Sequence, residues 1–273
     1  KTIDKLINKK FLIKTDISNA NHQICYGTRQ SLEQEKSIIS ICYEGKNKFN
    51  SISGVKDIEH YFKLQEEEKN IKLTKGQLEA VRLILNCKDQ FSIIQGYAGV
   101  GKTFAIGKAR EYLDHINQIN KESNPDHVNY QIIGLAPSGS AAKELESVLG
   151  KADTLQYLLR KYNGYANGRG TIDGIEKEKS KFTNKIMLID ESSMISCDQM
   201  HGLLNIAKKL DLRLVFLGDK SQILSVDAGL PFHSLQKEDL KIAKMTDILR
   251  QNNPISKAIA YSSYAKDFHS VFE

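Results

Sequence analysis

The stretch Phe91-Ser92-Ile93-Ile94-Gln95-Gly96-Tyr97-Ala98-Gly99-Val100-Gly101-Lys102-Thr103 decides the fold of this chain. Its first residues form an apolar run of strand type that stops at Gly96, and a loop with three glycines follows. Lys102 and Thr103 then begin a helical pattern that reaches about Ile116. The stretch matches the pattern G-x-x-x-x-G-K-[ST] between a strand and a helix, which is the setting that a phosphate-binding loop requires.

The residue types of this loop explain how it would bind an anion. Glycines let backbone N–H groups turn toward a phosphate with no Cβ in the way, and the start of the helix adds further donors and a positive dipole end. Lys102 would meet the β- and γ-phosphates of ATP, and Thr103 would bind Mg²⁺. We therefore expect this segment to bind ATP and Mg²⁺ through Gly96, Ala98, Gly99, Val100, Gly101, Lys102, Thr103 and Phe104.

Composition describes an ordinary globular protein. The 273 residues, with 40% hydrophobic and 26% charged side chains, suffice for one large domain or two modest ones. A net charge of +6 permits nucleic-acid binding but does not by itself indicate it. The four cysteines are scattered, and neither a secretory signal nor a membrane-length apolar run is visible, so reduced thiols in a cytoplasmic protein are expected. The chain begins at Lys1 without Met, which predicts a piece of a longer protein.

The chain divides into two regions at about residue 72. Residues 1–72 are expected to form a small N-terminal α+β module, in which a packing platform is favoured over a wing-like DNA contact because no basic cluster is present. Residues 73–273 alternate strand and helix patterns, which predicts an α/β domain with a mostly parallel sheet and helices on both faces. The predicted strands and helices of the first region are helix 2–9, strands 11–15 and 23–26, and helices 31–43 and 54–69.

Five strands are predicted in the second region, and the polar stretch 163–184 is expected to be a mobile surface excursion. Ligands of such folds bind at the carboxyl ends of the strands. Gly96, Asp190 and Asp219 all follow such ends, so we expect them to converge on one site. The predicted strands are 91–96, 130–136, 185–189, 212–217 and one near 240–245.

Gln77 has two compatible interpretations. Thr74, with Gln77 three residues later, makes a capping box for the helix that follows. The Gln77 amide can also both donate to and accept from the edge of an adenine base. The sequence leaves the structural and the nucleotide-binding roles equally open.

Four further residues are candidates for chemistry after the later strands. Asp190 and Glu191 could serve only to cap a helix, but beside a complete phosphate-binding loop they are expected to hold the Mg²⁺ region and polarise the attacking water. Gln222 either bonds a γ-phosphate or the lytic water, or merely orders its loop. Arg250 would supply positive charge to the γ-phosphate, or else is an ordinary surface residue.

Six short motifs come in the order and rough spacing of superfamily 1 helicases. They resemble most the RecD-like branch, superfamily 1B, and within it the helicase portion of TraI-type conjugative relaxases. The segments Val226–Phe232 and Tyr26–Arg29 are similar to further parts of that group, so the resemblance covers essentially the whole chain. The six motifs are Thr74-Lys75-Gly76-Gln77, Gly96–Thr103, Gly134–Ser138, Asp190-Glu191-Ser192-Ser193, Gly218–Gln222 and Leu249-Arg250-Gln251.

The resemblance implies a RecA-like, ATP-driven motor that moves 5′ to 3′ on single-stranded DNA. By position, Gln77 would contact adenine, Asp190 and Glu191 would be metal carboxylate and general base, and Gln222 would sense the γ-phosphate. Arg250 would contact phosphate, with Lys102 and Thr103 in the roles given above. The resemblance also implies contacts to the DNA backbone, with ordinary helix capping as the alternative, at Pro137, Ser138, Gly139 and Thr154.

The departures from the family pattern limit this expectation. No second RecA-like domain follows Arg250, and no histidine cluster marks a relaxase nickase. We therefore expect a first motor domain that hydrolyses ATP slowly alone and works with a second RecA-like domain, a relaxase and the conjugation machinery in its parent chain. The alternative is a non-motor module that binds single-stranded DNA without turnover. A small-molecule kinase is disfavoured because nothing resembles a lid or an acceptor site.

Overall fold

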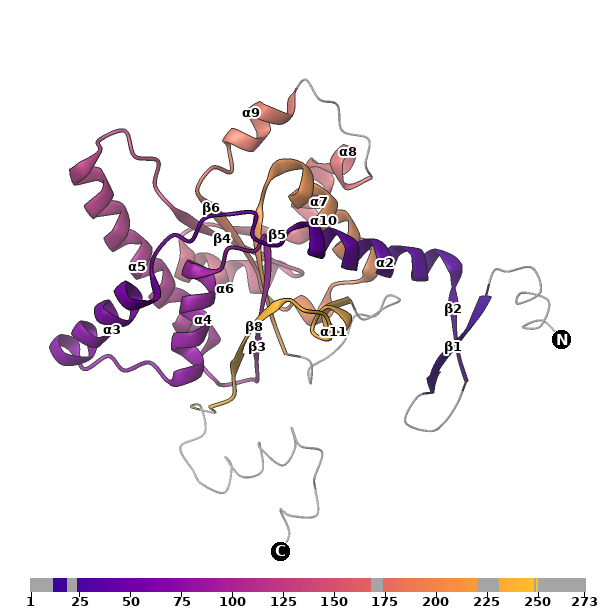
Figure 1. Ribbon diagram of the computed structural model, residues 1–273, viewed down its shortest axis with the longest axis horizontal. Coiled ribbons are helices and arrows are strands. Elements are labelled where there is room, and N and C mark those ends of the chain that lie inside the picture. Colours follow the sequence, from indigo (N-terminus) through magenta and orange to yellow (C-terminus); the bar gives the residue numbers. More distant parts are fainter. Residues whose placement is uncertain (1–11, 19–23, 168–173, 220–230, 248, 250–273) are drawn as a thin grey trace, which may run out of the picture.

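The computed structural model describes residues 12–18, 24–167, 174–219, 231–247 and 249. Within these residues the centre of the molecule is a six-stranded sheet with the strand order β5-β4-β6-β7-β3-β8 (Figure 1). Every pairing in it is parallel, which confirms the predicted α/β class with a parallel sheet. The strands are β3 (Phe91–Gly96), β4 (Gln131–Ala136), β5 (Ala152–Thr154), β6 (Lys185–Ile189), β7 (Arg213–Gly218) and β8 (Lys241–Met245).

Helices cover both faces of this sheet, as predicted. Successive side chains of a strand point to opposite faces, so each apolar strand feeds two cores. In β3, for example, Ile93 joins one hydrophobic cluster and Ile94 the other. The helices of the second region are α4 (Lys75–Asn86), α5 (Lys102–Ser123), α6 (Gly139–Leu149), α7 (Leu155–Lys161), α8 (Asn163–Ala166), α9 (Ile175–Ser180), the 3₁₀ turn η2 (Ser192–Met194), α10 (Cys197–Leu210) and α11 (Pro231–Leu235).

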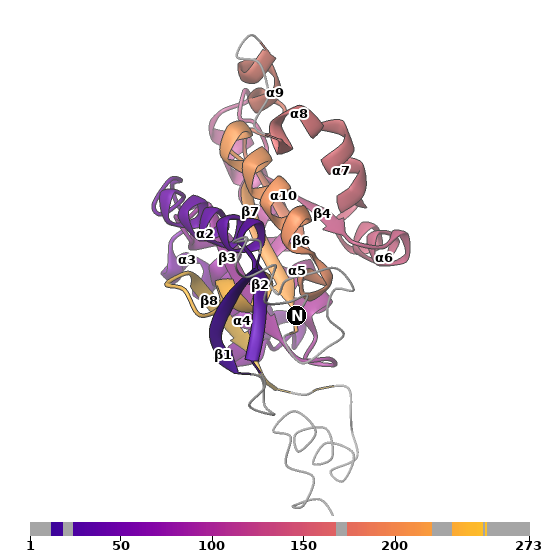
Figure 2. The same cartoon turned by 90° about the vertical axis from the view of Figure 1, so that its right-hand side faces the viewer.

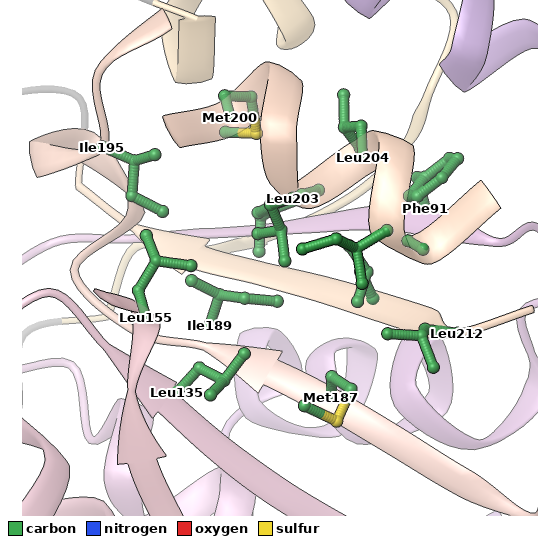
Figure 3. Packing of buried hydrophobic residues seen from close by; sticks show 14 of the residues in the cluster. Phe91, Leu135, Leu155, Met187, Ile189, Ile195, Met200, Leu203, Leu204 and Leu212 are labelled. Carbon is green, nitrogen blue, oxygen red and sulfur yellow. The ribbon is translucent and has the colours of Figure 1, made fainter. Parts of the chain in front are cut away.

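The core beneath α10 shows why its sequence forms a helix at this place. Ser196 and Gln199 make a capping box at its start, and its apolar side chains then recur on the face that meets the sheet. Figure 3 shows Met200, Leu203 and Leu204 above Met187 and Ile189 of β6. This packing fixes the position of β6, whose carboxyl end carries the predicted acidic pair.

The N-terminal region contributes two helices to the same cores. An antiparallel hairpin of β1 (Leu12–Ser18) and β2 (Ile24–Thr28) stands apart from the sheet (Figures 1 and 2) and leads into α2 (Arg29–Glu44). Ile38 of α2 packs in the cluster that contains α10, and Ile58 of α3 (Val55–Lys69) packs in the cluster that contains α4 and α5. The two helices therefore complete the core of the second region, while the boundary near residue 72 stays a prediction.

The stretch 163–184 was predicted to be a mobile surface excursion, but both of its described ends form short helices that pack on the core. Tyr165 and Ala166 of α8 and Phe182 after α9 pack against the hydrophobic cluster, and the Tyr162 hydroxyl donates to Glu178 at 3.0 Å. Apolar contacts with α10 thus order segments whose glycine and asparagine content favours a loop. Residues 168–173 lie outside the described residues, as does the predicted helix 2–9.

The sheet order brings the predicted site together. Because β6, β7 and β3 are neighbours and parallel, the residues after their carboxyl ends lie at one edge of the sheet. Gly96, Asp190 and Asp219 are those residues, as the sequence predicted. No helix in the described part of the chain is both long and apolar enough to cross a membrane.

Candidate active site

The loop between β3 and α5 has the backbone that an anion cradle needs. Gly99 (φ 79°) and Gly101 (φ 78°) are both in the left-handed region, which a side chain would disfavour. Gly101 is the N-cap of α5 and makes no side-chain cap, so the first N–H groups of this helix are left for another acceptor. A Cβ at Gly96 would lie 3.0 Å from Cδ of Lys102. The loop therefore has the backbone geometry of an anion-binding turn, and ATP binding stays a prediction.

Lys102 lies between this loop and a group of carboxylates. Its Nζ donates to the carbonyl oxygens of Gly96 at 2.9 Å and Tyr97 at 3.3 Å. Burial lowers the pKa of the ammonium group, and the charges of Asp190, Asp219 and Glu191 oppose that shift. The ammonium group is thus held at the end of β3 by weak neutral acceptors, which a phosphate oxygen would replace with a stronger one.

Asp190 and Glu191 are set at the end of β6 by the backbone. The N–H of Asp190 donates to Leu135 O at 2.9 Å, and Oδ1 of Asp190 accepts from the N–H of Glu191 at 2.8 Å. Glu191 has φ 50°, a strained conformation for a residue with a side chain. Its side chain does not cap the η2 turn that follows. The structural alternative, a plain helix cap, therefore does not account for Glu191.

The electrostatic surroundings of these two acids come partly from an unpredicted residue. Burial raises the pKa of Asp190, and the nearby charge of Glu144 on α6 raises it further. Burial, Asp190 and Glu144 together raise the pKa of Glu191, with Lys102 acting in the opposite direction. A carboxylate with a raised pKa is a better proton acceptor near neutral pH. Nothing in the sequence marks Glu144, because only the packing of α6 on the sheet brings it to the site.

Asp219 is fully buried at the end of β7. Its Oδ1 accepts from Nε2 of Gln95 at 3.3 Å, and Oε1 of Gln95 in turn accepts from Nε2 of Gln236 at 3.0 Å. These bonds connect the end of β7, strand β3 and the segment after α11. The hydrogen bond from Gln95 holds Asp219 beside the end of β3, where the phosphate-binding loop begins.

Gln77 performs its predicted structural role. Its Oε1 accepts from the N–H of Thr74 at 3.0 Å, and Thr74 Oγ1 accepts from the N–H of Gln77 at 3.2 Å, which completes the capping box. Its Nε2 also donates to Val100 O at 3.1 Å, so the buried side chain ties α4 to the phosphate-binding loop. A Cβ at Gly101 would lie 2.5 Å from this nitrogen. The adenine contact stays a prediction.

A second tie to the loop comes from beyond β8 and was not predicted. The N–H of Leu249 donates to Gly99 O at 3.0 Å, and the Leu249 side chain is 47% exposed. Phe104, on the first turn of α5, is 44% exposed and lies within 5.4 Å of Nζ of Lys108, measured to the ring centroid. Both side chains offer apolar surface beside the loop.

The residues predicted to touch DNA lie on the other half of the same edge. Ala136 pairs with Thr154 in the β4–β5 register, so Pro137, Ser138 and Gly139 lie beside Thr154. Ser138 Oγ accepts from Ala141 N and Thr154 Oγ1 from Tyr157 N, each at 3.2 Å. The alternative of helix capping therefore holds for both hydroxyls, and DNA contact stays a prediction.

Tyr157 is exposed on this surface and sequence reasoning missed it. Half of its side chain is accessible (50%), and Nζ of Lys161 lies 5.6 Å from its ring centroid. The spacing of an aromatic residue and a lysine by four positions on a helix was the available signal.

Of the remaining predicted site residues, the structure describes Thr103 but not Gln222 or Arg250. Thr103 follows Lys102 on the first turn of α5 and is half-buried, on the same edge as Asp190. No group of three or more His, Cys, Asp or Glu side chains suited to a metal ion occurs in the described ranges, so the Mg²⁺ assignment of Thr103 and Asp190 stays a prediction. Gln222 and Arg250 lie outside the described residues.

Comparison with known proteins shows which family the chain belongs to. The family model described as "AAA domain" matches residues 72–268. The chain belongs to this family. It is 30% identical over 269 residues to the Multifunctional conjugation protein TraI of Escherichia coli K12, covering 97% of this chain and 14% of TraI. The RecBCD enzyme subunit RecD of Haemophilus influenzae is 28% identical over 196 residues, or 63% of this chain and 27% of RecD.

The predicted membership in superfamily 1B, as a helicase domain of the TraI type, is confirmed. A solved structure of two coordinating Pif1 helicases at forked double-stranded DNA aligns with a TM-score of 0.47 at 20% identity, over 74% of this chain and 50% of that one. The chain spans only 14% of the length of TraI, so the activities of the whole relative are not carried over with the family.

Proposed function

We propose that this AAA domain is the ATP-binding and ATP-hydrolysing motor domain of a 5′-to-3′ single-stranded DNA translocase within a conjugative DNA-transfer protein. One observation carries the proposal. Lys102 is half-buried between the phosphate-binding loop at the end of β3 and the carboxylates Asp190 and Glu191 after β6 and Asp219 after β7. A lone nucleotide-binding loop would need only the lysine, whereas this group of acids beside it suits hydrolysis.

The side chains divide the work of hydrolysis as follows. The loop N–H groups and Lys102 bind the β- and γ-phosphates, with Thr103 and Asp190 as ligands of a Mg²⁺ ion that would offset phosphate charge. Glu191 accepts a proton from the attacking water while the water oxygen bonds to the γ-phosphorus and the bond from that phosphorus to ADP breaks. The pKa of Glu191 is raised mainly by burial, and this makes its carboxylate a better proton acceptor in that step.

The parent chain completes the motor. Gln222 is proposed as the γ-phosphate sensor and Arg250 as a phosphate contact, and a second RecA-like domain supplies the charge that this domain lacks. Arginine stabilisation from a partner is worth about 10³–10⁵ in rate in related enzymes, so slow turnover is expected here. Single-stranded DNA would cross the surface of Pro137, Ser138, Gly139 and Thr154, held through its phosphates. A relaxase and the conjugation machinery are the expected partners, in the cytoplasm.

The decisive experiment compares ATP turnover by residues 1–273 with and without single-stranded DNA. We expect slow hydrolysis that depends on Mg²⁺ and rises with DNA, and its loss in the Glu191→Gln variant. Tight DNA binding with no turnover in either condition would favour the alternative of a non-motor binding module. Polarity is tested on the longer parent protein with duplexes that carry a 5′ or a 3′ tail, and a preference for the 3′ tail would overturn the assigned direction.

A further inference from the structure

A hollow of about 510 Å³ lies at the amino ends of β6 and β7, at the opposite edge of the sheet from the nucleotide site. The loop before α3 forms one wall with Phe49, and α9 and the segment after it form another. Arg213, the first residue of β7, forms part of the floor. The proposed motor function uses none of these residues.

Arg213 is a buried charge with an incomplete set of partners. Its side chain is 7% exposed, Nη2 donates to Asn50 O at 2.7 Å, and the guanidinium lies 4.8 Å from the ring centroid of Phe49. Nη1 is buried and has no hydrogen-bond partner among the described residues. Burial lowers the pKa of Arg213, and no carboxylate in the described ranges opposes this.

Burying the Arg213 guanidinium costs free energy unless an acceptor or a negative charge pairs with it. Guanidinium groups stay charged, and a buried charge is ordinarily paired, because an unpaired one loses its hydration without compensation. The carboxylate nearest in sequence, Asp211, is already engaged by Lys48 at 2.6 Å and Lys179 at 2.8 Å. Asp211 therefore does not supply the acceptor that Arg213 lacks.

Other groups around the hollow suit an anion. Lys179 and Lys185 line it together with Arg213, and Thr183 is also part of the lining, whereas the Ser180 hydroxyl already donates to Lys177 O at 2.8 Å. Burial lowers the pKa of Lys185, with the nearby charge of Lys151 acting in the same direction, so added negative charge would favour the charged form of Lys185. Glu176 and Asp211 are the acidic residues of the lining, and both are paired with Lys179.

We propose that this hollow is a binding site for an oxyanion, a phosphate or carboxylate group whose oxygens bond the Arg213 guanidinium. The planar fork of arginine matches both groups through two parallel hydrogen bonds. Phe49 covers the guanidinium and must turn aside for both terminal nitrogens to reach one anion. It is half-buried and followed by the exposed Asn50, so little packing opposes that motion. Bound anion would then join α9 to the loop before α3.

The test measures thermal unfolding in a Lys102→Ala background, because the phosphate-binding loop would itself bind phosphate. Sodium chloride, phosphate and acetate are compared at equal ionic strength and pH. Phosphate or acetate at about ten times its Kd should raise the melting temperature by about 3–6 °C over chloride. The anion that gives the larger rise identifies the preferred group.

Two added substitutions decide whether Arg213 is responsible. The rise should vanish with Arg213→Met and persist with Arg160→Met, which removes an exposed arginine of α7. In chloride alone, Arg213→Met should not lower the melting temperature, because it removes an uncompensated buried charge. Equal rises with and without Arg213, or no rise from either anion, would overturn the proposal.

A variant that keeps the charge guards against misfolding of Arg213→Met. Arg213→Lys retains a cation but loses the fork, so the anion-dependent rise should shrink severalfold while the chloride baseline stays close to that of the parent. An undiminished rise would show that a point charge suffices at this position, which would overturn the proposed binding of the anion by the guanidinium fork.

Discussion

The two edges of one parallel sheet bury positive charge in opposite ways. At the carboxyl edge, Lys102 has three carboxylates from two strand ends around it. At the amino edge, Arg213 has a backbone carbonyl and an aromatic ring, and no carboxylate in the described ranges. The difference teaches where the protein supplies its own countercharge and where it leaves that to a ligand. In the proposed function, a phosphate at the carboxyl edge would replace the neutral carbonyls around Lys102, whereas an anion at the amino edge would supply the first countercharge of Arg213.

Left-handed backbone turns occur at both edges of the sheet. The carboxyl edge contains Gly99, Gly101 and Glu191, all with positive φ. At the amino edge, Nε2 of Gln90 donates to Ala207 O at 2.8 Å and to Leu212 O at 3.0 Å, which ties β3 to α10 and β7. Asn184 (φ 57°) and Asp211 (φ 51°) also have positive φ at the amino edge, so left-handed turns do not by themselves mark the edge where chemistry is expected.

The largest expected effect is at the carboxyl edge. Lys102→Ala should lower kcat/KM for ATP by about 1,000-fold, because it removes the charge that meets the developing negative charge of the phosphates. Nucleotide titration measures the ATP affinity, and a steady-state ATPase assay measures kcat/KM. Lys121→Ala, on the exposed last turn of the same helix, is the matched control and should leave them unchanged. Unchanged ATP affinity in the Lys102→Ala variant would contradict the loop assignment.

Glu191→Gln separates binding from turnover at the same edge. It should lower kcat by about 100-fold or more, because it removes the proton acceptor while leaving the phosphate contacts in place. ATP affinity should stay within a few-fold, measured by equilibrium titration. Turnover at the wild-type rate would remove Glu191 as the base.

Glu144→Gln sharpens that result through pH. The charge of Glu144 raises the pKa of Glu191, so removing it should move the acid limb of the pH–rate profile to lower pH. An acid limb that stays in place would show that Glu191 is not the titrating group in that limb.

A smaller effect is expected at the far end of the carboxyl edge. Tyr157→Ala should weaken single-stranded DNA binding by about tenfold, because stacking of one base on an aromatic ring is worth about 1–3 kcal/mol. Fluorescence anisotropy with ordinary and abasic oligonucleotides measures the loss, and Tyr157→Phe should retain most of the affinity. Equal affinity of the wild-type protein for both oligonucleotides would exclude stacking.

The smallest effect concerns stability. Burial raises the pKa of Asp190, so the folded state holds this proton more tightly than the unfolded chain does. Its contribution to stability is therefore present below the unfolded pKa and is lost as pH rises through the folded pKa. Asp190→Asn should melt about 2–4 °C higher at pH 7.5, with a smaller difference at pH 4.5. A variant that melts lower than wild type at both pH values would contradict this.

The elements with long patterns were predicted well. The apolar runs of β3, β6 and β7 read as strands because both of their faces are buried, and the capping box of Thr74 and Gln77 marked the start of α4. β5 was missed because three residues give no periodicity. α8 and α9 were missed because contacts with α10 override the loop-like composition of their sequence.

The sequence by itself determined the phosphate-binding loop, the acids at the strand ends and the parallel sheet that joins them. Local chemistry suffices there, since glycines, a lysine and strand-end carboxylates lie in short contiguous patterns. Only the tertiary structure decided that Glu144 acts on Glu191, that Leu249 reaches Gly99 and that Arg213 is buried without a carboxylate. Each depends on which segments pack together, because burial and charge act through space between residues that the chain keeps apart.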